Sequence, residues 1–243
     1  MILILYIFLS CFNFVLGNIP LTEILSWNAP QFKLSETELS HAKKVRDHIH
    51  IQMTLHETAF FLNFIQNGTD YFEFGCGGST FVASAYGPPQ LNISSVDSSI
   101  EWINKIKENK LCSLKLARNL LHMDLVDIGS VGMWGFPTNE EKKEAWHLYS
   151  QSISLTNTKY DRILVDGRFR VACVLYSFLS NPQARVLLHD FFHYDHHEEY
   201  KILLQVLDIV KYVDSLVELK VKDNVRYSEI LNMYNAYTKT VKR

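Results

Sequence analysis

Ten residues of the chain, YFEFGCGGST from Tyr71 to Thr80, have the types and spacing of a ligand-binding turn. The first four predict a short buried strand, and the sequence after the turn favours a helix. Gly75, Gly77 and Gly78 allow a sharp turn and let a ligand lie against the backbone without meeting a Cβ atom. Such a unit makes a ligand site at the carboxyl end of a parallel sheet. A purely structural turn is the alternative.

Two acidic residues narrow the class of ligand. Asp97 ends a second apolar segment, LNISSVDSS, where an acidic residue binds a ribose diol in sheets of this type. Glu73 stands just before the glycine turn, and its carboxylate would disfavour a pyrophosphate but favour an ammonium group. S-adenosylmethionine carries both a ribose diol and an α-ammonium group. The pair therefore favours this cofactor over a nicotinamide or flavin dinucleotide.

A second group of polar residues follows two further predicted strands, in YDRILVDG and ARVLLHDF. These residues are Asp166, His189 and Asp190. Methyl transfer requires an acceptor aligned with the departing sulfur and removal of the acceptor's proton. Because imidazole titrates near neutrality, His189 or His193 could act as the general base, and a hydrogen bond at a strand end is the alternative.

Several neighbouring side chains have two interpretations each. Arg168 and Arg170 could clamp an acidic substrate group, or one of them could pair with Asp166 or Glu73 to hold the strand ends together. Three closely spaced histidines resemble zinc ligands but are more typical of a solvated turn: His193, His196 and His197.

A long polar segment, residues 129–159, separates the two groups and is rich in helix-breaking residues. A segment of this length inside a domain is usually functional or disordered. Trp134 and Phe136 near its start favour a functional segment that walls an acceptor pocket, with packing onto the sheet as the alternative. Trp102 is expected to pack against the sheet, with contact to an adenine as the alternative.

The elements that position these residues alternate between strand and helix. One helical pattern covers residues 35–66, starting with a capping-box signature at Ser35 and Glu38. The predicted strands are 71–74, 92–96, one within 114–128, one in YDRILVDG that ends at Asp166, 184–190, 212–221 and 225–237. After residue 66 we predict one helix that ends near residue 86 and further helices over 100–109, 169–179 and 197–210. This order predicts an α/β, doubly wound, mostly parallel sheet with helices on both faces and an antiparallel carboxyl-terminal end.

Composition predicts one folded unit with an amino-terminal targeting segment. The 243 residues are 47% hydrophobic and 21% charged, with net charge −2 and no block of like charge, which gives no sign of a nucleic-acid partner. Residues 1–17 fit a secretory signal but lack Lys and Arg, so an uncleaved membrane anchor stays open. We expect a helical extension over 18–66 and the main domain over 67–243.

Two glycosylation sequons agree with a secretory, lumenal or extracellular location. They begin at Asn67 and Asn92. The cysteines left after signal removal, Cys76, Cys112 and Cys173, are too few for a disulfide framework.

The motifs YFEFGCGGST, SSVDSS, IGSVGMWGFP, YDRILVDGRFRVAC and VLLHDF resemble those of class I S-adenosylmethionine-dependent methyltransferases. The resemblance covers about residue 67 to the carboxyl terminus. It implies a Rossmann-like, seven-stranded sheet with the seventh strand inserted antiparallel. It also implies a set of cofactor-binding residues: Glu73, Gly75, Gly77, Asp97 and, near the adenine, Asp127, with Asp124 as a competing choice.

Asp166 and Asp190 also resemble the two acids that hold magnesium in catechol-type O-methyltransferases. Phe191 stands where that group has an asparagine, so we predict no metal ligands, although two carboxylates could suffice for Mg²⁺.

Together, these patterns predict methyl transfer to a hydroxyl of a small molecule or glycan, with Asp166, His189 and Asp190 at the reacting centre. Two alternatives are a catalytically inactive methyltransferase-fold binding module in the secretory pathway and a dinucleotide-dependent oxidoreductase.

Overall fold

The computed structural model describes residues 29–193 and 197–240, and their strands form one seven-stranded sheet in the order β3-β2-β1-β4-β5-β7-β6. The strands are β1 (Asp70–Phe74), β2 (Asn92–Asp97), β3 (Leu121–Leu125), β4 (Arg162–Val165), β5 (Arg185–Leu188), β6 (Leu207–Val213) and β7 (Leu216–Val221). Strands β1 to β5 are parallel, whereas β7 pairs antiparallel with both β5 and β6. The predicted doubly wound sheet with an antiparallel end is therefore confirmed.

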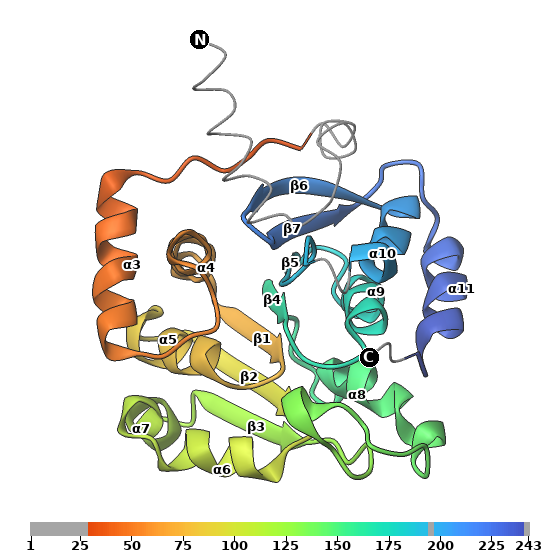
Figure 1. Ribbon diagram of the computed structural model, residues 1–243, viewed down its shortest axis with the longest axis horizontal. Helices are drawn as coiled ribbons and strands as arrows, with labels where there is room; N and C mark the ends of the chain where they lie inside the picture. The colour runs from red at the N-terminus through yellow and green to blue at the C-terminus, as the bar shows by residue number, and fades with distance from the viewer. Residues whose placement is uncertain (1–28, 194–196, 241–243) are drawn as a thin grey trace.

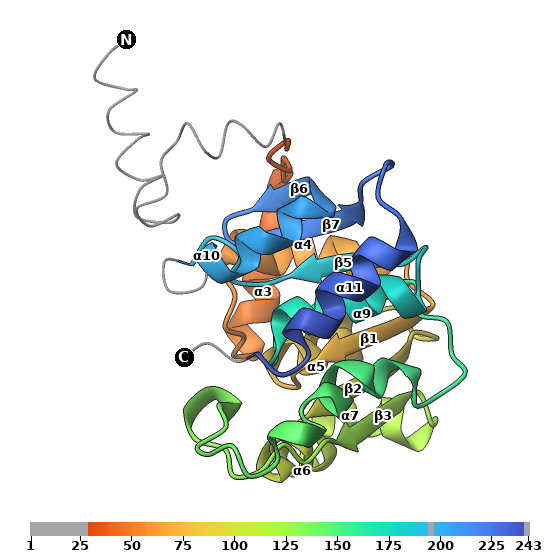
Figure 2. The same cartoon turned by 90° about the vertical axis from the view of Figure 1, so that its right-hand side faces the viewer.

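Helices cover both faces of this sheet (Figures 1 and 2). One face carries α3 (Glu36–His48), α4 (Leu55–Gln66), α5 (Gly78–Tyr86), α6 (Ile100–Glu108) and α7 (Lys110–Ala117), and the other carries α8 (His147–Gln151), α9 (Arg170–Ser180) and α11 (Tyr227–Tyr237). The buried apolar residues divide into two clusters, one for each face. Because helices cover both faces, the central strand β1 is buried from Tyr71 to Phe74 without alternation.

The register brings the strand ends to one level. Phe74 of β1 pairs with Val96 of β2 and with Val165 of β4, and Val165 pairs in turn with Leu188 of β5. The residues that follow these strands therefore meet at the same edge of the sheet. They include every residue that we predicted at the reacting centre.

The predicted helix over 35–66 is wrong in its length, because the chain forms two helices separated by residues 49–54. Ser35 and Glu38 form the expected capping box at the start of α3. A second capping box, Thr54 with Glu57, begins α4 and interrupts the apolar pattern that we took as continuous. The Arg46 side chain donates to backbone oxygens of the intervening segment.

Both amino-terminal helices belong to the core of the sheet. Ala42 and Val45 of α3 and Phe60 and Phe64 of α4 are fully buried in the same apolar cluster as Tyr71 of β1. Residue 31 also forms a β-bridge with residue 212 in β6. Residues 31–66 thus cover one face of the sheet together with α5.

The carboxyl-terminal assignments were partly wrong. The helix predicted over 197–210 is only α10 (His197–Tyr200) followed by a 3₁₀ turn, Lys201–Gln205, because residues 207–213 pair with β7 as an edge strand. The strand predicted over 225–237 is the helix α11. Its buried residues, Ile230 and Tyr234, are four positions apart and pack against α9, which is a helical spacing that the tyrosine content obscured.

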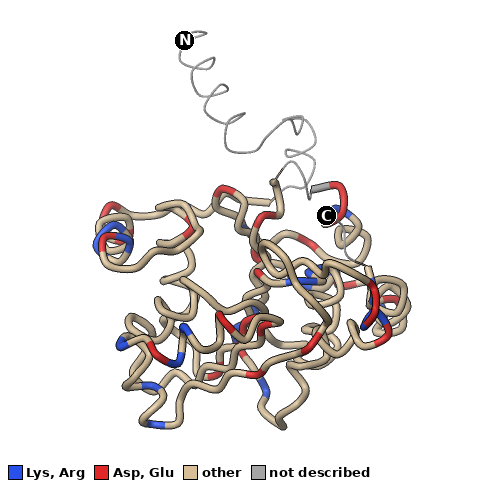
Figure 3. Tube along the Cα trace, turned by 60° about the horizontal axis from the view of Figure 1, so that its bottom comes forward, with Lys and Arg blue, Asp and Glu red and all other residues tan. Residues whose placement is uncertain are grey.

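Residues 129–159 contain short helical turns in addition to α8: Met133–Gly135, Lys143–Ala145 and Ser152–Ser154. Trp146 and Tyr149 are buried and stack against Phe169, so this segment packs onto the end of β4. Acidic and basic residues are interspersed along the described part of the trace (Figure 3). Within the described ranges, no helix has the length and apolar content needed to cross a membrane.

Candidate active site

The glycine turn after β1 is tightly packed at Gly75 and Gly78 and open at Gly77. Gly75 has φ +92°, and a Cβ atom there would lie 2.7 Å from Gly167 Cα, so only glycine fits at this position. A Cβ atom at Gly77 would meet nothing within 4 Å. At Gly78 it would lie 2.6 Å from Ile51 Cα, so the segment between α3 and α4 packs against the start of α5. The open side of the turn is therefore at Gly77.

Asp97 joins this turn to the end of β2. Its Oδ2 accepts a hydrogen bond of 2.9 Å from the Cys76 amide, and its Oδ1 accepts one of 2.7 Å from the Ser99 amide. Burial raises the pKa of Asp97, and these backbone donors oppose the rise. The two motifs that the sequence singled out thus lie in direct contact.

Glu73 lies beneath the turn and has no exposed surface. One oxygen accepts from the Tyr71 and Ser79 hydroxyls, each at 2.9 Å, and the other accepts from Thr80. Burial raises the pKa of Glu73 to about 7, although these hydroxyl donors oppose the rise. We expected Glu73 to meet a ligand's ammonium group directly or through a water molecule. Protein hydroxyls surround its carboxylate, which argues against the direct contact, and the contact through water stays a prediction.

Asp127 and Asp124 are both exposed. The Val126 amide donates to the Asp97 carbonyl oxygen, so Asp127 lies just beyond the end of β2. Its carboxylate nevertheless binds Lys142 and accepts from the Gly129 amide, and this hydrogen bonding lowers its pKa. In the structure, Asp127 stabilises the segment that follows β3 through these contacts. Its contact with an adenine stays a prediction.

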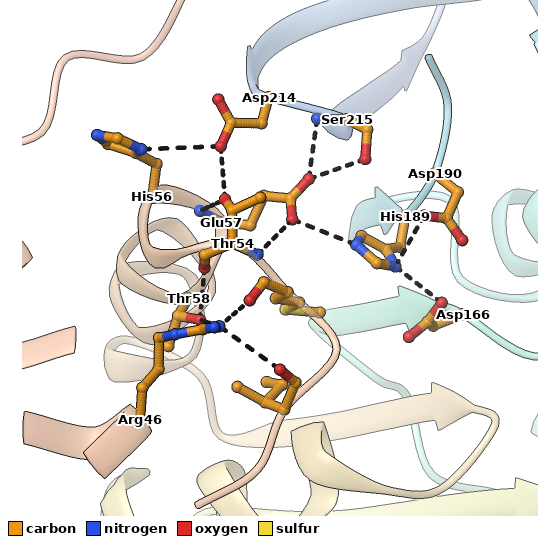
Figure 4. A network of polar contacts seen from close by, with 12 residues as sticks. Arg46, Thr54, His56, Glu57, Thr58, Asp166, His189, Asp190, Asp214 and Ser215 are labelled. Atoms are coloured by element: carbon orange, nitrogen blue, oxygen red, sulfur yellow. Dashed lines mark hydrogen bonds and ion pairs between the residues drawn. The ribbon is translucent and has the colours of Figure 1, made fainter. Parts of the chain in front are cut away.

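The ends of β4 and β5 hold a buried charged cluster (Figure 4). His189 Nδ1 lies 3.0 Å from Asp166 Oδ1 and 3.6 Å from Asp190 Oδ1, and its Nε2 lies 3.4 Å from Glu57 Oε2. Burial lowers the pKa of His189, but the charges of Asp166 and Asp190 outweigh burial and raise it well above the ordinary value. The raised pKa favours the imidazolium form, in which both ring N–H groups have carboxylate acceptors, and this argues against His189 as the general base.

Arg170 completes the cluster. Its guanidinium donates to Asp190 Oδ2 at 2.9 Å and lies 3.1 Å from Asp166 Oδ1. Burial raises the pKa of Asp190, but the charges of His189 and Arg170 lower it to a net value of about 2. We had two interpretations of the arginines: a clamp for an acidic substrate group, or an ion pair that holds the strand ends together. Arg170 forms the ion pair with Asp166.

Arg168 differs from Arg170. Its Nε is buried without a hydrogen-bond partner among the described residues, and its guanidinium lies 4.1 Å from the centre of the Phe136 ring. The Gly135 position between Phe136 and Trp134 lies close to both Arg168 and Ser98. Residues 135 and 136 therefore lie against the segments that follow β2 and β4.

Two tryptophans that the sequence singled out are exposed at the surface. Trp134 is 71% exposed. Trp102 is 41% exposed and contacts Lys105, so it is not fully packed against the sheet, and its contact with an adenine stays a prediction.

The structure does not test whether the histidines after β5 bind zinc. His193 is exposed. Residue 196 lies outside the described residues, as does the side chain of His197, so the predicted cluster cannot be placed.

Glu57 is the site residue that sequence reasoning missed. Its carboxylate is 3% exposed and accepts from the Thr54 amide at 2.8 Å and from the Ser215 amide at 2.9 Å, besides its contact with His189. Burial raises the pKa of Glu57, but His189 together with the hydrogen bonds from Thr54 and Ser215 outweighs burial and lowers it. The TLHE capping-box sequence was the available signal for a helix start at this point.

Comparison with solved structures agrees with this architecture. A methyltransferase-like protein from Silicibacter pomeroyi DSS-3 is 23% identical, with a TM-score of 0.66 over 79% of this chain and 98% of that chain. The chain has a methyltransferase-like fold. No family model matches the sequence, and no curated protein matches it.

Looser alignments of this methyltransferase-like fold include two proteins solved with SAH. The Podospora anserina methyltransferase PaMTH1 is 11% identical, with a TM-score of 0.47 over 79% of this chain and 91% of that chain. A Bacillus cereus O-methyltransferase is 12% identical, with a TM-score of 0.45 over 78% of this chain and 92% of that chain. The fold assignment rests on the first alignment alone.

Proposed function

We propose that this protein binds S-adenosylmethionine and transfers its methyl group to a hydroxyl of a small molecule or glycan. One observation carries the proposal: the Asp97 carboxylate is fastened to the glycine turn at Cys76, next to open space at Gly77. A ribose diol at Asp97 and the rest of the cofactor along the turn would fit this arrangement.

The residues of the turn fit the cofactor's polar groups. Each Asp97 oxygen accepts one backbone hydrogen bond and keeps acceptor capacity for a ribose hydroxyl. The bound cofactor would supply an electrophilic methyl group on a sulfonium. Glu73 supports the turn from below, and in its ionised form above about pH 7 it would lower the electrostatic cost of a nearby ammonium group without touching it.

Asp166 is the residue best placed to hold the acceptor's proton. Its Oδ1 contacts His189 and Arg170, whereas its Oδ2 makes no contact with a donor among the described residues, and its side chain is 26% exposed. His189 and Arg170 orient this carboxylate. We therefore assign proton removal to Asp166 Oδ2 and orientation to His189.

Calorimetric titration with S-adenosylhomocysteine tests the proposal. Asp97→Asn replaces a charged acceptor with an amide and should weaken binding by about 1–3 kcal/mol. Asp223→Asn is the matched control, because this exposed residue follows β7 at the opposite edge of the sheet. An unfolding curve of each variant separates a lost contact from a lost fold.

Other results of the titration favour the alternatives. Equal affinity of wild type and Asp97→Asn would contradict the assigned ribose contact. Binding without transfer to any hydroxyl acceptor would favour an inactive binding module, and preferential binding of a nicotinamide or flavin dinucleotide would favour an oxidoreductase.

We also propose that the protein enters the secretory pathway and that Asn67 is its glycan acceptor. Asn67 is exposed just after α4. Asn92, by contrast, donates its Nδ2 to Asp70 Oδ1 at 3.0 Å, so a glycan there would break a contact between β1 and β2. A cleaved signal within residues 1–17 would give a lumenal or extracellular protein, and an uncleaved one would tether it to the membrane.

A further inference from the structure

The cluster at the ends of β4 and β5 resembles a metal site in its residue types. Asp166, His189 and Asp190 each offer one ligand atom, and these atoms lie within 4.8 Å of one another. We propose that Arg170 and His189 occupy the cation position between the two aspartates, so that this centre works without a divalent metal ion. The proposal concerns the charges of the cluster and stands whether or not the chain transfers a methyl group.

The Arg170 guanidinium lies where a cation shared by both carboxylates would lie. It contacts Asp190 Oδ2 at 2.9 Å and Asp166 Oδ1 at 3.1 Å. It also donates to the carbonyl oxygens of His189 at 2.7 Å and Gly167 at 3.1 Å. With only 7% of its side chain exposed, Arg170 is held by both strand ends and cannot turn away without leaving these acceptors unpaired.

His189 is the second internal cation. Its Nδ1, the atom that a metal would need, lies 3.0 Å from Asp166 Oδ1 and 3.6 Å from Asp190 Oδ1 as a donor. Its Nε2 lies beside Glu57, whose carboxylate is as buried as the imidazole. Hydrogen bonds on both ring nitrogens keep the imidazole protonated, and a protonated nitrogen cannot ligate a metal.

The chain also lacks an oxygen ligand at the next position. Phe191 follows Asp190 and is fully buried against Phe192, so it contributes packing at the position where the catechol-type enzymes that the sequence resembles have an asparagine. The cluster contains three carboxylates, from Glu57, Asp166 and Asp190, and two internal cations. Their formal charges leave one negative charge, which is too little to favour a further doubly charged ion in a buried site.

Removing Arg170 should uncover a metal site, and this provides the test. We would measure Mn²⁺ binding by electron paramagnetic resonance for wild type, Arg170→Met and Arg170→Lys. Arg168→Met is the matched control, because it removes a neighbouring arginine that does not contact the two carboxylates. Arg170→Met should bind Mn²⁺ at least about tenfold more tightly than the other three proteins, since two carboxylates become available to it.

Thermal unfolding gives a second measurement on the same proteins. Mn²⁺ should raise the unfolding temperature of Arg170→Met and leave that of wild type unchanged, because only the variant gains a bound ligand. Adding Asp190→Asn to Arg170→Met should abolish the effect. If Arg170→Met folds only when Mn²⁺ is present during refolding, that result supports the proposal as well.

A stoichiometric Mn²⁺ site in wild type that Asp190→Asn removes would overturn the proposal. So would equal Mn²⁺ affinity in Arg170→Met and Arg168→Met. If Arg170→Met does not fold under any condition, the Mn²⁺ titration of wild type tests the proposal by itself. All of these measurements are made without cofactor or acceptor, so their outcome is separate from that of the S-adenosylhomocysteine titration.

Discussion

Replacing Glu73 by glutamine should change how the stability of this protein depends on pH. Glu73 is fully buried, and its pKa rises from 4.5 to about 7 in the folded state. Between these two values the folded protein holds a proton that the unfolded chain has released. Stability therefore falls as pH rises through this window and levels off above about pH 7. At about 1.4 kcal/mol per pKa unit, the fall is about 3 kcal/mol.

Glutamine cannot titrate, so Glu73→Gln should remove this fall. The hydroxyls of Tyr71, Ser79 and Thr80 can rotate to accept from the new amide, which keeps the local packing. The free energy of unfolding of the variant minus that of wild type should increase by about 3 kcal/mol between about pH 4.5 and pH 8. Urea unfolding at a series of pH values measures this difference, in which the titration of all other groups cancels.

Glu38→Gln provides a control of opposite sign. Hydrogen bonds from Ser35 lower the pKa of Glu38, so wild type gains stability from this residue as pH rises and the variant does not. Parallel stability curves for Glu73→Gln and wild type would refute the reasoning. They would mean that Glu73 remains ionised beneath the turn, with its three hydroxyl donors outweighing burial.

Four further outcomes can be measured, and the first three follow from contacts at the same edge of the sheet. Gly75→Ala should cost at least about 2 kcal/mol in urea unfolding, because its φ is positive and Gly167 blocks the new methyl group. Gly77→Ala should leave stability almost unchanged but weaken S-adenosylhomocysteine binding, and the reverse pattern would contradict the open side of the turn. Glu57→Ala should cost about 3 kcal/mol by chemical denaturation, since it leaves the His189 imidazolium buried with one partner fewer, and a loss below about 1 kcal/mol would show that Asp166 and Asp190 suffice. Expressed in cells that add N-glycans, the protein should lose one glycosidase-sensitive mass shift with Asn67→Gln and none with Asn92→Gln.

The sequence predicted the parallel part of the sheet well because local and tertiary signals agree there. The strands around Phe74 and Val165 are apolar runs bounded by turn residues, as fully buried parallel strands should be. Residues 225–237 were misassigned because their tyrosines favour strands on average, while burial of Ile230 and Tyr234 against α9 depends on tertiary packing.

For the site, the sequence located the strand ends but could not give the partners of each side chain. The contact between Asp97 and the Cys76 amide follows from the strand register, which the motif positions suggested. Which arginine pairs with the aspartates depends on rotamers that neither spacing nor composition specifies. Glu57 reaches His189 across 132 positions of the chain, and a contact so distant in sequence has no local signature.

The bridge between residues 31 and 212 sets a limit on how this protein can be shortened for laboratory work. A fragment starting at residue 67 would keep every recognisable motif, yet it would strip α3 and α4 from the sheet and expose the apolar surface that they cover. Such a fragment is expected to aggregate. A usable shortened protein must therefore start before residue 31. An affinity tag is better attached before that residue than between α3 and α4.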